Sequence, residues 1–249
     1  MRHSSFSTKT ITNLFVTFML FVTIILASSA LVHAEEINKN TLVADEFKKV
    51  YDPLEPVNRA IYEFNLLADE YLMRPITKSY RFIFPKPVRK GIGNVVSNLQ
   101  EPITFLNATL QGDVTYAITT LGRFMLNTTF GIGGVFKFVK TTDNRTEDFG
   151  QTLGRYGLGS GPYLMLPILG PSNLRDGVGR IADIYSDPLT YALNDEERIA
   201  QAVITGIVRY DDVMDLIEEI ELTSLDPYAA YRSMYQQYRE NQISNGKTK

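Results

Sequence analysis

Apolar residues recur at intervals of three and four along most of the chain after Asp52. This period places them on one face of an α-helix. The pattern predicts helices over roughly 57–73, 88–99, 102–110, 114–125, 194–210, 211–221 and 226–238. We find no stretch in which apolar and polar residues alternate as they do in a half-buried strand. The sequence therefore predicts the all-α fold class.

Helix ends carry their own signals. Pro75 is expected to end or kink the first helix, and Pro102 to open the third, because proline lacks the backbone N–H that a helix interior uses. Asn194 followed by Glu197 has the spacing of a capping box. Asp226 before Pro227 combines a capping side chain with proline at the first helical position.

Two connectors differ from ordinary loops because they carry no charged side chain. One is 127–136, which is rich in glycine, and the other is 156–174, nineteen residues long. The second matches the length of a membrane span, yet its glycines and prolines exclude a regular helix. Irregular backbone survives at membrane depth only where protein buries it or a wet cavity adjoins it. The stretch is therefore either a buried loop of a helical core or the lining of a passage.

The first 34 residues resemble a secretory signal peptide. Arg2 and Lys9 precede an uncharged run from Leu14 to Leu26, and small residues lead to Ala34. We expect cleavage after Ala34, with an uncleaved anchor as the alternative. Residues 35–50 are predicted to be a linker, 51–243 a single domain, and 244–249 a disordered tail.

Composition excludes several kinds of active site. The chain has no cysteine or tryptophan, and both histidines lie inside the predicted signal. The chain without this signal therefore lacks the residues for Ser-His-Asp or Cys-His catalysis and lacks the usual zinc ligands. We predict no enzyme, no metal site and no cofactor. Without residues 1–34, 23 basic and 28 acidic side chains give a net charge of −5. This balance argues against nucleic acid as a partner.

One segment is strongly basic. No acidic residue lies between Glu70 and Glu101, and aromatic residues are interleaved with six cations. The six are Arg74, Lys78, Arg81, Lys86, Arg89 and Lys90. Cations beside rings suit the boundary between lipid headgroups and acyl chains, so we predict a headgroup interface. The alternative is a solvated helix face with aromatic residues in the core.

Several long blocks resemble the MlaA/VacJ family of outer-membrane lipoproteins. They are DPLEPVNRAIYEFN (52–65), PKPVRKGIGNVVSNLQEPITFLN (85–107), LQGD (110–113), GRFMLNTTFGIGG (122–134), EDFGQTLGRYGLGSGPYLMLPILGPSNLRD (147–176) and DPY (226–228). The resemblance covers roughly residues 51–239. It implies a ring-like all-α domain of amphipathic, interfacial helices with apolar Gly/Pro-rich connectors, lying in the outer membrane around an amphipathic channel.

The resemblance also implies a function. Members withdraw mislocalised phospholipid from the outer leaflet, pass it to a soluble periplasmic carrier and associate with trimeric porins. This chain is expected on the periplasmic side of the outer membrane. Family members usually carry a lipidated cysteine at the end of the signal, which this sequence lacks. Attachment would then rest on interfacial helices, an uncleaved signal or a porin.

On this resemblance we hypothesise which residues line or gate the lipid route. They are Phe64, Asn65, Asn107, Phe130, Gly131, Gly133, Gly134, Phe149, Gly150 and Tyr163. Two other functions stay open: a porin-associated adaptor of the envelope that carries no lipid, and a lipid hydrolase, which the missing histidine and cysteine disfavour.

Overall fold

The computed structural model describes residues 50–139 and 143–245. The elements in chain order are α2 (Glu55–Ala68), the π-helical turn η2 (Asp69–Met73), α3 (Arg74–Ile83), α4 (Lys86–Leu110), α5 (Val114–Thr129), α6 (Phe149–Arg155), β1 (Tyr163–Leu166), β2 (Gly170–Asn173), α7 (Leu174–Ser186), α8 (Leu189–Ala192), α9 (Asp195–Thr223) and α10 (Pro227–Ile243). The all-α prediction is confirmed, with one small hairpin as the exception. The predicted signal, nearly all of the linker and most of the tail lie outside the described residues.

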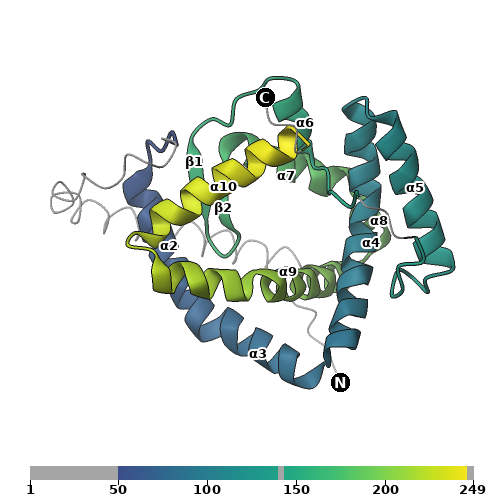
Figure 1. Ribbon diagram of the computed structural model, residues 1–249, viewed down its shortest axis with the longest axis horizontal. Coiled ribbons are helices and arrows are strands. Elements are labelled where there is room, and N and C mark those ends of the chain that lie inside the picture. The colour runs from purple at the N-terminus through teal and green to yellow at the C-terminus, as the bar shows by residue number, and fades with distance from the viewer. Residues whose placement is uncertain (1–49, 140–142, 246–249) are drawn as a thin grey trace, which may run out of the picture.

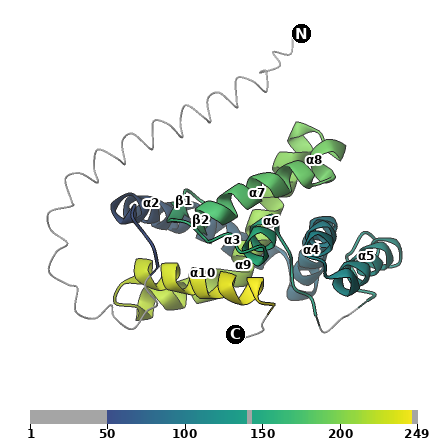
Figure 2. The same ribbon diagram turned by 90° about the horizontal axis from the view of Figure 1, so that it is seen from above.

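The elements form a ring. Figure 1 shows α2 and α3 along one side and α4 along the next, with α6, α7 and the β1–β2 hairpin closing the circuit back to α2. Helices α9 and α10 run along this ring and touch several of its members, and α5 lies outside it against α4. Seen from above in Figure 2, α10 lies on one side of the ring and α7 and α8 rise on the other.

Capping side chains fix where five helices begin. The backbone N–H groups at these helix starts have no partner within the helix, and a preceding Asp or Asn side chain accepts from one of them. The caps are Asp113 for α5, Asp148 for α6, Asn173 for α7, Asn194 for α9 and Asp226 for α10. The predicted capping box of Asn194 with Glu197 is present, and so is the predicted start at Asp226 and Pro227.

Two proline predictions need correction. Pro102 lies inside α4, so the two helices predicted on either side of it are one. Of the two outcomes expected at Pro75, an end of the helix does not occur, because the helical run passes through η2 into α3, where Pro75 occupies the first turn. The first turn of a helix tolerates proline. At Pro102, α4 packs along α5, and this tertiary packing outweighs one missing hydrogen bond.

A hairpin occupies the uncharged stretch 156–174, where no strand was predicted. Strands β1 and β2 pair antiparallel, with Tyr163 opposite Asn173 and Leu166 opposite Gly170. Side chains of β1 alternate between buried and half-buried. Four residues are too few for an alternating pattern to stand out from the sequence, which is why the strands were missed.

Candidate functional site

Burial in the described part of this protein is inverted relative to an ordinary soluble domain, because more polar than hydrophobic side chains are buried. Among the described residues, 18 polar or charged side chains are buried and only 11 hydrophobic ones are, while large hydrophobic side chains are exposed along many elements. Soluble domains seldom expose contiguous apolar surface, and they seldom bury charges without partners. The ring therefore presents apolar side chains outward and keeps polar ones inside. In the segments described, no helix is both long and apolar enough to cross a bilayer.

Helix α7 shows the inversion most clearly. Its exposed stripe is apolar and consists of Leu174, Val178, Ile181 and Tyr185, which recur at helical spacing. Its other face carries Asp176 and Gly179, both buried, and the half-buried Asp183. Helix α5 has a similar exposed stripe of Val114, Ile118, Leu121 and Met125. Apolar faces of this kind suit lipid or another protein.

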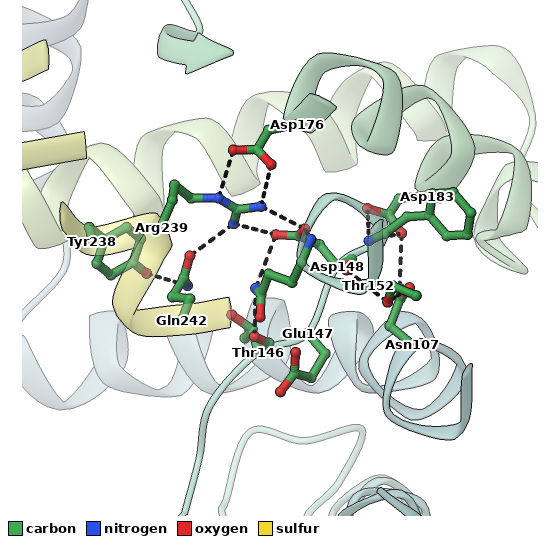
Figure 3. Close-up of polar contacts among 12 residues, drawn as sticks. Asn107, Thr146, Glu147, Asp148, Thr152, Asp176, Asp183, Tyr238, Arg239 and Gln242 are labelled. Atoms are coloured by element: carbon green, nitrogen blue, oxygen red, sulfur yellow. Dashed lines mark hydrogen bonds and ion pairs between the residues drawn. The ribbon is translucent and has the colours of Figure 1, made fainter. Parts of the chain in front are cut away.

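Arg239 is the centre of the polar interior. From α10 it reaches Asp148, the cap of α6, at 2.7 and 2.9 Å, and Asp176 in the first turn of α7 at 2.9 and 3.0 Å (Figure 3). Burial acts to raise the pKa of both carboxyl groups, but the Arg239 guanidinium outweighs it and both are lowered. One arginine thus joins three helices, and both carboxylates stay ionised.

The network continues from Asp176. Asn173 and Tyr235 each donate to its Oδ2 at 2.7 Å, and Arg175 donates to its Oδ1 at 2.9 Å. Each carboxylate lone pair therefore has a donor, as a buried charge requires. This ties the end of β2 and one face of α10, which carries both Tyr235 and Arg239, to the start of α7.

A second cluster surrounds Asp183 on α7 (Figure 3). Its carboxylate accepts from the backbone N–H of Phe149 at 3.1 Å and from Nδ2 of Asn107 at 3.0 Å. The hydroxyl of Thr152 donates to Oδ1 of Asn107 at 2.8 Å. Burial raises the pKa of Asp183 to about 6, against these hydrogen bonds. Asn107 and Phe149, two of the hypothesised residues, therefore belong to the junction of α4, α6 and α7.

Gly150, another hypothesised residue, lies where α6 crosses α7. A Cβ on Gly150 would come within 2.6 Å of Oδ1 of Asp176, and a Cβ on Gly179 would lie 2.3 Å from the Gly150 nitrogen. No side chain fits between the two backbones. The structure thus places Gly150 at a close helix crossing beside the Arg239 network.

Asn65 and Tyr163 meet at the hairpin. Asn65 on α2 donates to the Leu166 carbonyl at 3.0 Å and accepts from the Ile168 N–H at 2.7 Å, so its amide holds the hairpin turn. Asn58, two turns earlier, pairs in the same way with the backbone of Tyr163 and Met165. The Tyr163 ring is buried against Tyr228 and Tyr235. Phe64 is half-buried on the same helix.

The glycine connector after α5 is a tight turn away from both clusters. Gly133 and Gly134 have φ of 66° and 92°, and a Cβ on Gly134 would lie 2.6 Å from Cβ of Asn98. Gly131 is buried, and Phe130 is 65% exposed beside Phe138. The hypothesised route residues thus fall in three places rather than on one continuous wall.

The basic segment divides into two kinds of side chain. Arg74 pairs with Asp69 and Glu221, while Arg81 and Arg89 both pair with Asp211 on α9. These arginines hold α3 and α4 to α9. Lys78, Lys86 and Lys90 are exposed and make no ion pair within the part of the chain that the structure describes.

A separate polar pocket lies between α4 and α5. Arg123 binds Glu101 bidentately at 2.6 and 2.7 Å on one side of it. The pocket has a volume of about 60 Å³ and is lined by polar side chains. That volume suits a few water molecules rather than a lipid. Across residues 50–139 and 143–245, no group of three or more His, Cys, Asp or Glu residues could hold a metal ion.

Sequence reasoning missed the charged residues at the centre. Arg239 lies in a tyrosine-rich helix, and Asp148, Asp176 and Asp183 were not singled out. Two signals were available: Asp148 and Asp176 stand inside the longest block of family resemblance, and Asp183 shares a helical face with Asp176. The helical periodicity of single segments cannot show that these side chains meet.

Comparison with known proteins gives a consistent set of relatives. The family model described as MlaA lipoprotein matches residues 50–242. The chain is 37% identical over 201 residues to the intermembrane phospholipid transport system lipoprotein MlaA of Escherichia coli K12, covering 78% of this chain and 79% of that protein. The protein of the same name from Haemophilus influenzae is 30% identical over 204 residues, covering 79% and 80%.

A solved structure is also similar. It concerns the maintenance of bacterial outer membrane lipid asymmetry and aligns with a TM-score of 0.67 at 36% sequence identity. The alignment covers 77% of this chain and 98% of that one. An uncharacterised protein of Rickettsia bellii is 35% identical over 201 residues, covering 79% of this chain and 78% of that protein.

Proposed function

Because the chain belongs to the MlaA lipoprotein family, we propose that it takes part in intermembrane phospholipid transport at the bacterial outer membrane. Its role is to let mislocalised phospholipid leave the outer leaflet through the polar interior of the ring. The observation that carries this proposal is the inverted burial of α7, with an apolar stripe outside and charged groups inside. A phospholipid needs both kinds of surface along one path.

The mechanism involves no bond chemistry. A charged headgroup costs several kcal/mol to move through hydrocarbon alone, and a polar interior with water reduces that cost. The acyl chains remain beside apolar side chains, so little apolar surface meets water. A passive route of this kind carries lipid in either direction. Net flow toward the inner membrane then requires a downstream partner that binds lipid more tightly.

Two protein partners belong to the proposal. A soluble periplasmic carrier receives the lipid, and a trimeric porin holds the ring in the outer membrane. The exposed apolar stripes on α5 and α7 support a location at the membrane, since they offer lipid-facing or protein-facing surface. The side chains of Lys78, Lys86 and Lys90 supply cations for the headgroup region.

The test is the amount of phospholipid in the outer leaflet of cells with and without this gene. We expect the amount to rise on deletion and to return when the wild-type chain is restored. The exposed pair Arg198 and Asp195 offers a matched control, so Arg198→Gln should restore the leaflet fully. Unchanged leaflet composition with continued porin association would favour the adaptor function instead.

A further inference from the structure

The polar pocket between α4 and α5 is separate from the two interior clusters. Its lining includes Asn98 and Glu101 from α4, Arg123 from α5, and Lys137 and Arg145 from the chain that follows α5. Figure 1 shows α4 as one side of the ring and α5 outside it. A pocket between these two helices therefore lies on the outer side of α4.

Asn98 brings an unpaired acceptor to this pocket. The residue is 4% exposed, and its Nδ2 donates to the hydroxyl of Thr128 at 2.8 Å, but its Oδ1 is buried with no donor. Gly134 lies against the rest of this side chain, because a Cβ added to Gly134 would meet Cβ, Cγ and Nδ2 of Asn98. A buried acceptor without a donor is costly, so the pocket favours a ligand that supplies an N–H or O–H group.

The charged side chains of the lining are paired, with the exception of Lys137. Arg123 holds both oxygens of Glu101 at 2.6 and 2.7 Å. Arg145 pairs with Glu147 at 2.7 Å. Lys137 is exposed and makes no ion pair or hydrogen bond within the part of the chain that the structure describes. The pocket thus combines a buried acceptor with one cation that is available to an anion.

Two asparagines of the lining fix the backbone on either side of Lys137. Nδ2 of Asn94 donates to the Val135 carbonyl at 2.9 Å, and Oδ1 of Asn127 accepts from the Val139 N–H at 2.9 Å. Lys137 lies midway between these two anchored residues. Its place beside the pocket is therefore set by α4 and α5.

Exposed rings flank Lys137. Phe136 and Phe138 are both exposed, and the Phe138 ring lies 5.5 Å from that of Phe130. Cations beside aromatic rings suit the boundary between lipid headgroups and acyl chains. The surroundings of the pocket therefore favour a ligand with apolar tails.

We propose that this pocket binds the headgroup of a phospholipid that carries a primary ammonium, as phosphatidylethanolamine does. The ammonium donates to Oδ1 of Asn98 and to Glu101, whose carboxylate keeps lone pairs beyond the two that Arg123 uses. The phosphate pairs with Lys137. The volume of about 60 Å³ is too small for a whole lipid but admits the ammonium end of its headgroup. The lipid assignment rests on the proposed function.

The geometry also predicts which headgroup is rejected. A choline headgroup has a trimethylammonium, which is bulkier and has no N–H group to donate. It would leave Oδ1 of Asn98 without a donor, and the penalty for an unpaired buried acceptor would remain. O-Phosphoethanolamine has the same charged groups as the lipid headgroup but no tails, so it separates recognition of the headgroup from recognition of the lipid.

The experiment measures binding to the purified full-length chain in non-ionic detergent by isothermal titration calorimetry. The probes are dihexanoylphosphatidylethanolamine, dihexanoylphosphatidylcholine and O-phosphoethanolamine. We expect the ethanolamine lipid to bind about tenfold more tightly than the choline lipid, since the latter loses a charge-assisted hydrogen bond. K137Q should weaken binding of the ethanolamine lipid about tenfold, and R198Q on an exposed ion pair should leave it unchanged.

A variant of Asn98 tests the acceptor directly. N98L should bind the two lipids with equal affinity, because it removes the atom that distinguishes them. Asn98 also contacts Thr128, so the unfolding midpoint of N98L is measured beside its affinity. K137Q decides the question if N98L does not fold, since the Lys137 side chain is exposed and has no partner to lose among the described residues.

Each outcome decides a separate point. Equal affinity of the wild-type chain for the two lipids, or wild-type affinity in K137Q, would overturn the site. Equal affinity for O-phosphoethanolamine and the ethanolamine lipid would overturn the lipid assignment. The outer leaflet of cells with and without the gene is scored in parallel. If it is the same in both while the purified protein still distinguishes the two lipids through Lys137, transport is wrong and the headgroup site stands.

Discussion

Asn107 on α4 and Asp183 on α7 are joined by a 3.0 Å hydrogen bond across 76 residues of sequence. The donor is an amide and the acceptor a carboxyl group whose pKa burial raises to about 6. An unfolded aspartate has a pKa near 4, so the folded protein binds this proton more tightly. The contribution of Asp183 to stability is therefore full at acid pH and is lost as pH rises through about 6.

The direction of the Asp183 pKa shift predicts how the stability of the protein depends on pH. Asp148 and Asp176 have lowered pKa values, so their effects fall at more acid pH. In the range from about 4.5 to 7.5, Asp183 acts together with Glu101 and Asp212, whose pKa values burial also raises. Unfolding midpoints of the purified protein should fall across this range, and Asp183→Asn should make the curve flatter. Asp187→Asn, at the end of α7 outside the cluster, is the control. A wild-type slope that persists in Asp183→Asn would refute the assignment.

Arg239 should be the most sensitive charged side chain. Arg239→Gln leaves Asp148 and Asp176 near each other without their shared cation, and breaking a buried pair typically costs about 3–5 kcal/mol. We expect a loss of that order in the free energy of unfolding at pH 7.5. Arg198→Gln should cost under about 1 kcal/mol, because its pair is exposed. Equal losses in the two variants would contradict a central role for Arg239.

Variants of Asn65 test the hairpin contacts separately from the stability of the whole ring. Asn65→Leu removes both bonds to the hairpin turn, so amide hydrogen exchange at Ile168 should accelerate while the rest of the ring keeps its protection. Lipid flow should change without global unfolding. Asn65→Asp keeps the acceptor for the Ile168 N–H and should exchange more slowly than Asn65→Leu. Unaltered exchange and unaltered transport in Asn65→Leu would remove Asn65 from the functional residues.

The three unpaired lysines test the headgroup interface. Replacing Lys78, Lys86 and Lys90 together with glutamine should weaken binding to vesicles that contain anionic phospholipid, by roughly 1 kcal/mol per lysine near the surface. The folded structure should be unaffected, since these side chains are exposed. Cosedimentation at low and high salt measures the effect. Binding that is equally strong and equally salt-dependent in the triple variant would exclude the lysines from the interface.

Local sequence patterns were sufficient to predict most of the helices. Periodicity and Asx caps act within one or two turns, so the starts of α9 and α10 could be predicted from Asn194 and Asp226. The same reasoning failed at Pro102, where packing against α5 keeps one helix continuous. It failed again at the hairpin, whose strands are stabilised from α2 by Asn58 and Asn65.

The Arg239 network, in contrast, is formed by residues that lie far apart in the sequence. Arg239 lies 91 residues from Asp148 and 63 from Asp176, and no periodicity links them. The basic segment shows the same limit, since Arg81 and Arg89 find Asp211 from 130 and 122 residues away. A run of cations read along the chain could not show which of them had internal partners. Only the lysines of that run remain without one among the described residues.

The crossing of α6 and α7 offers a comparison within a single helix. Gly177 and Gly179 both lie in α7, yet a Cβ on Gly177 would meet nothing within 4 Å, whereas one on Gly179 would lie 2.3 Å from a backbone nitrogen. Gly177→Ala should be neutral or stabilise the protein by up to about 1 kcal/mol through helix propensity. Gly179→Ala must separate the helices, and overpacking of this kind typically costs about 1–3 kcal/mol.

The separation would also pull Asp148 and Asp176 away from Arg239, because both acids lie at the start of the helices that cross. Gly179→Ala should therefore raise the pKa values of these two carboxyl groups as well as lower the unfolding midpoint. Unfolding midpoints from pH 3 to pH 5 would then fall more steeply toward acid in the wild type than in Gly179→Ala. Parallel curves for Gly177→Ala and Gly179→Ala would mean that the ion-pair network does not depend on the close crossing.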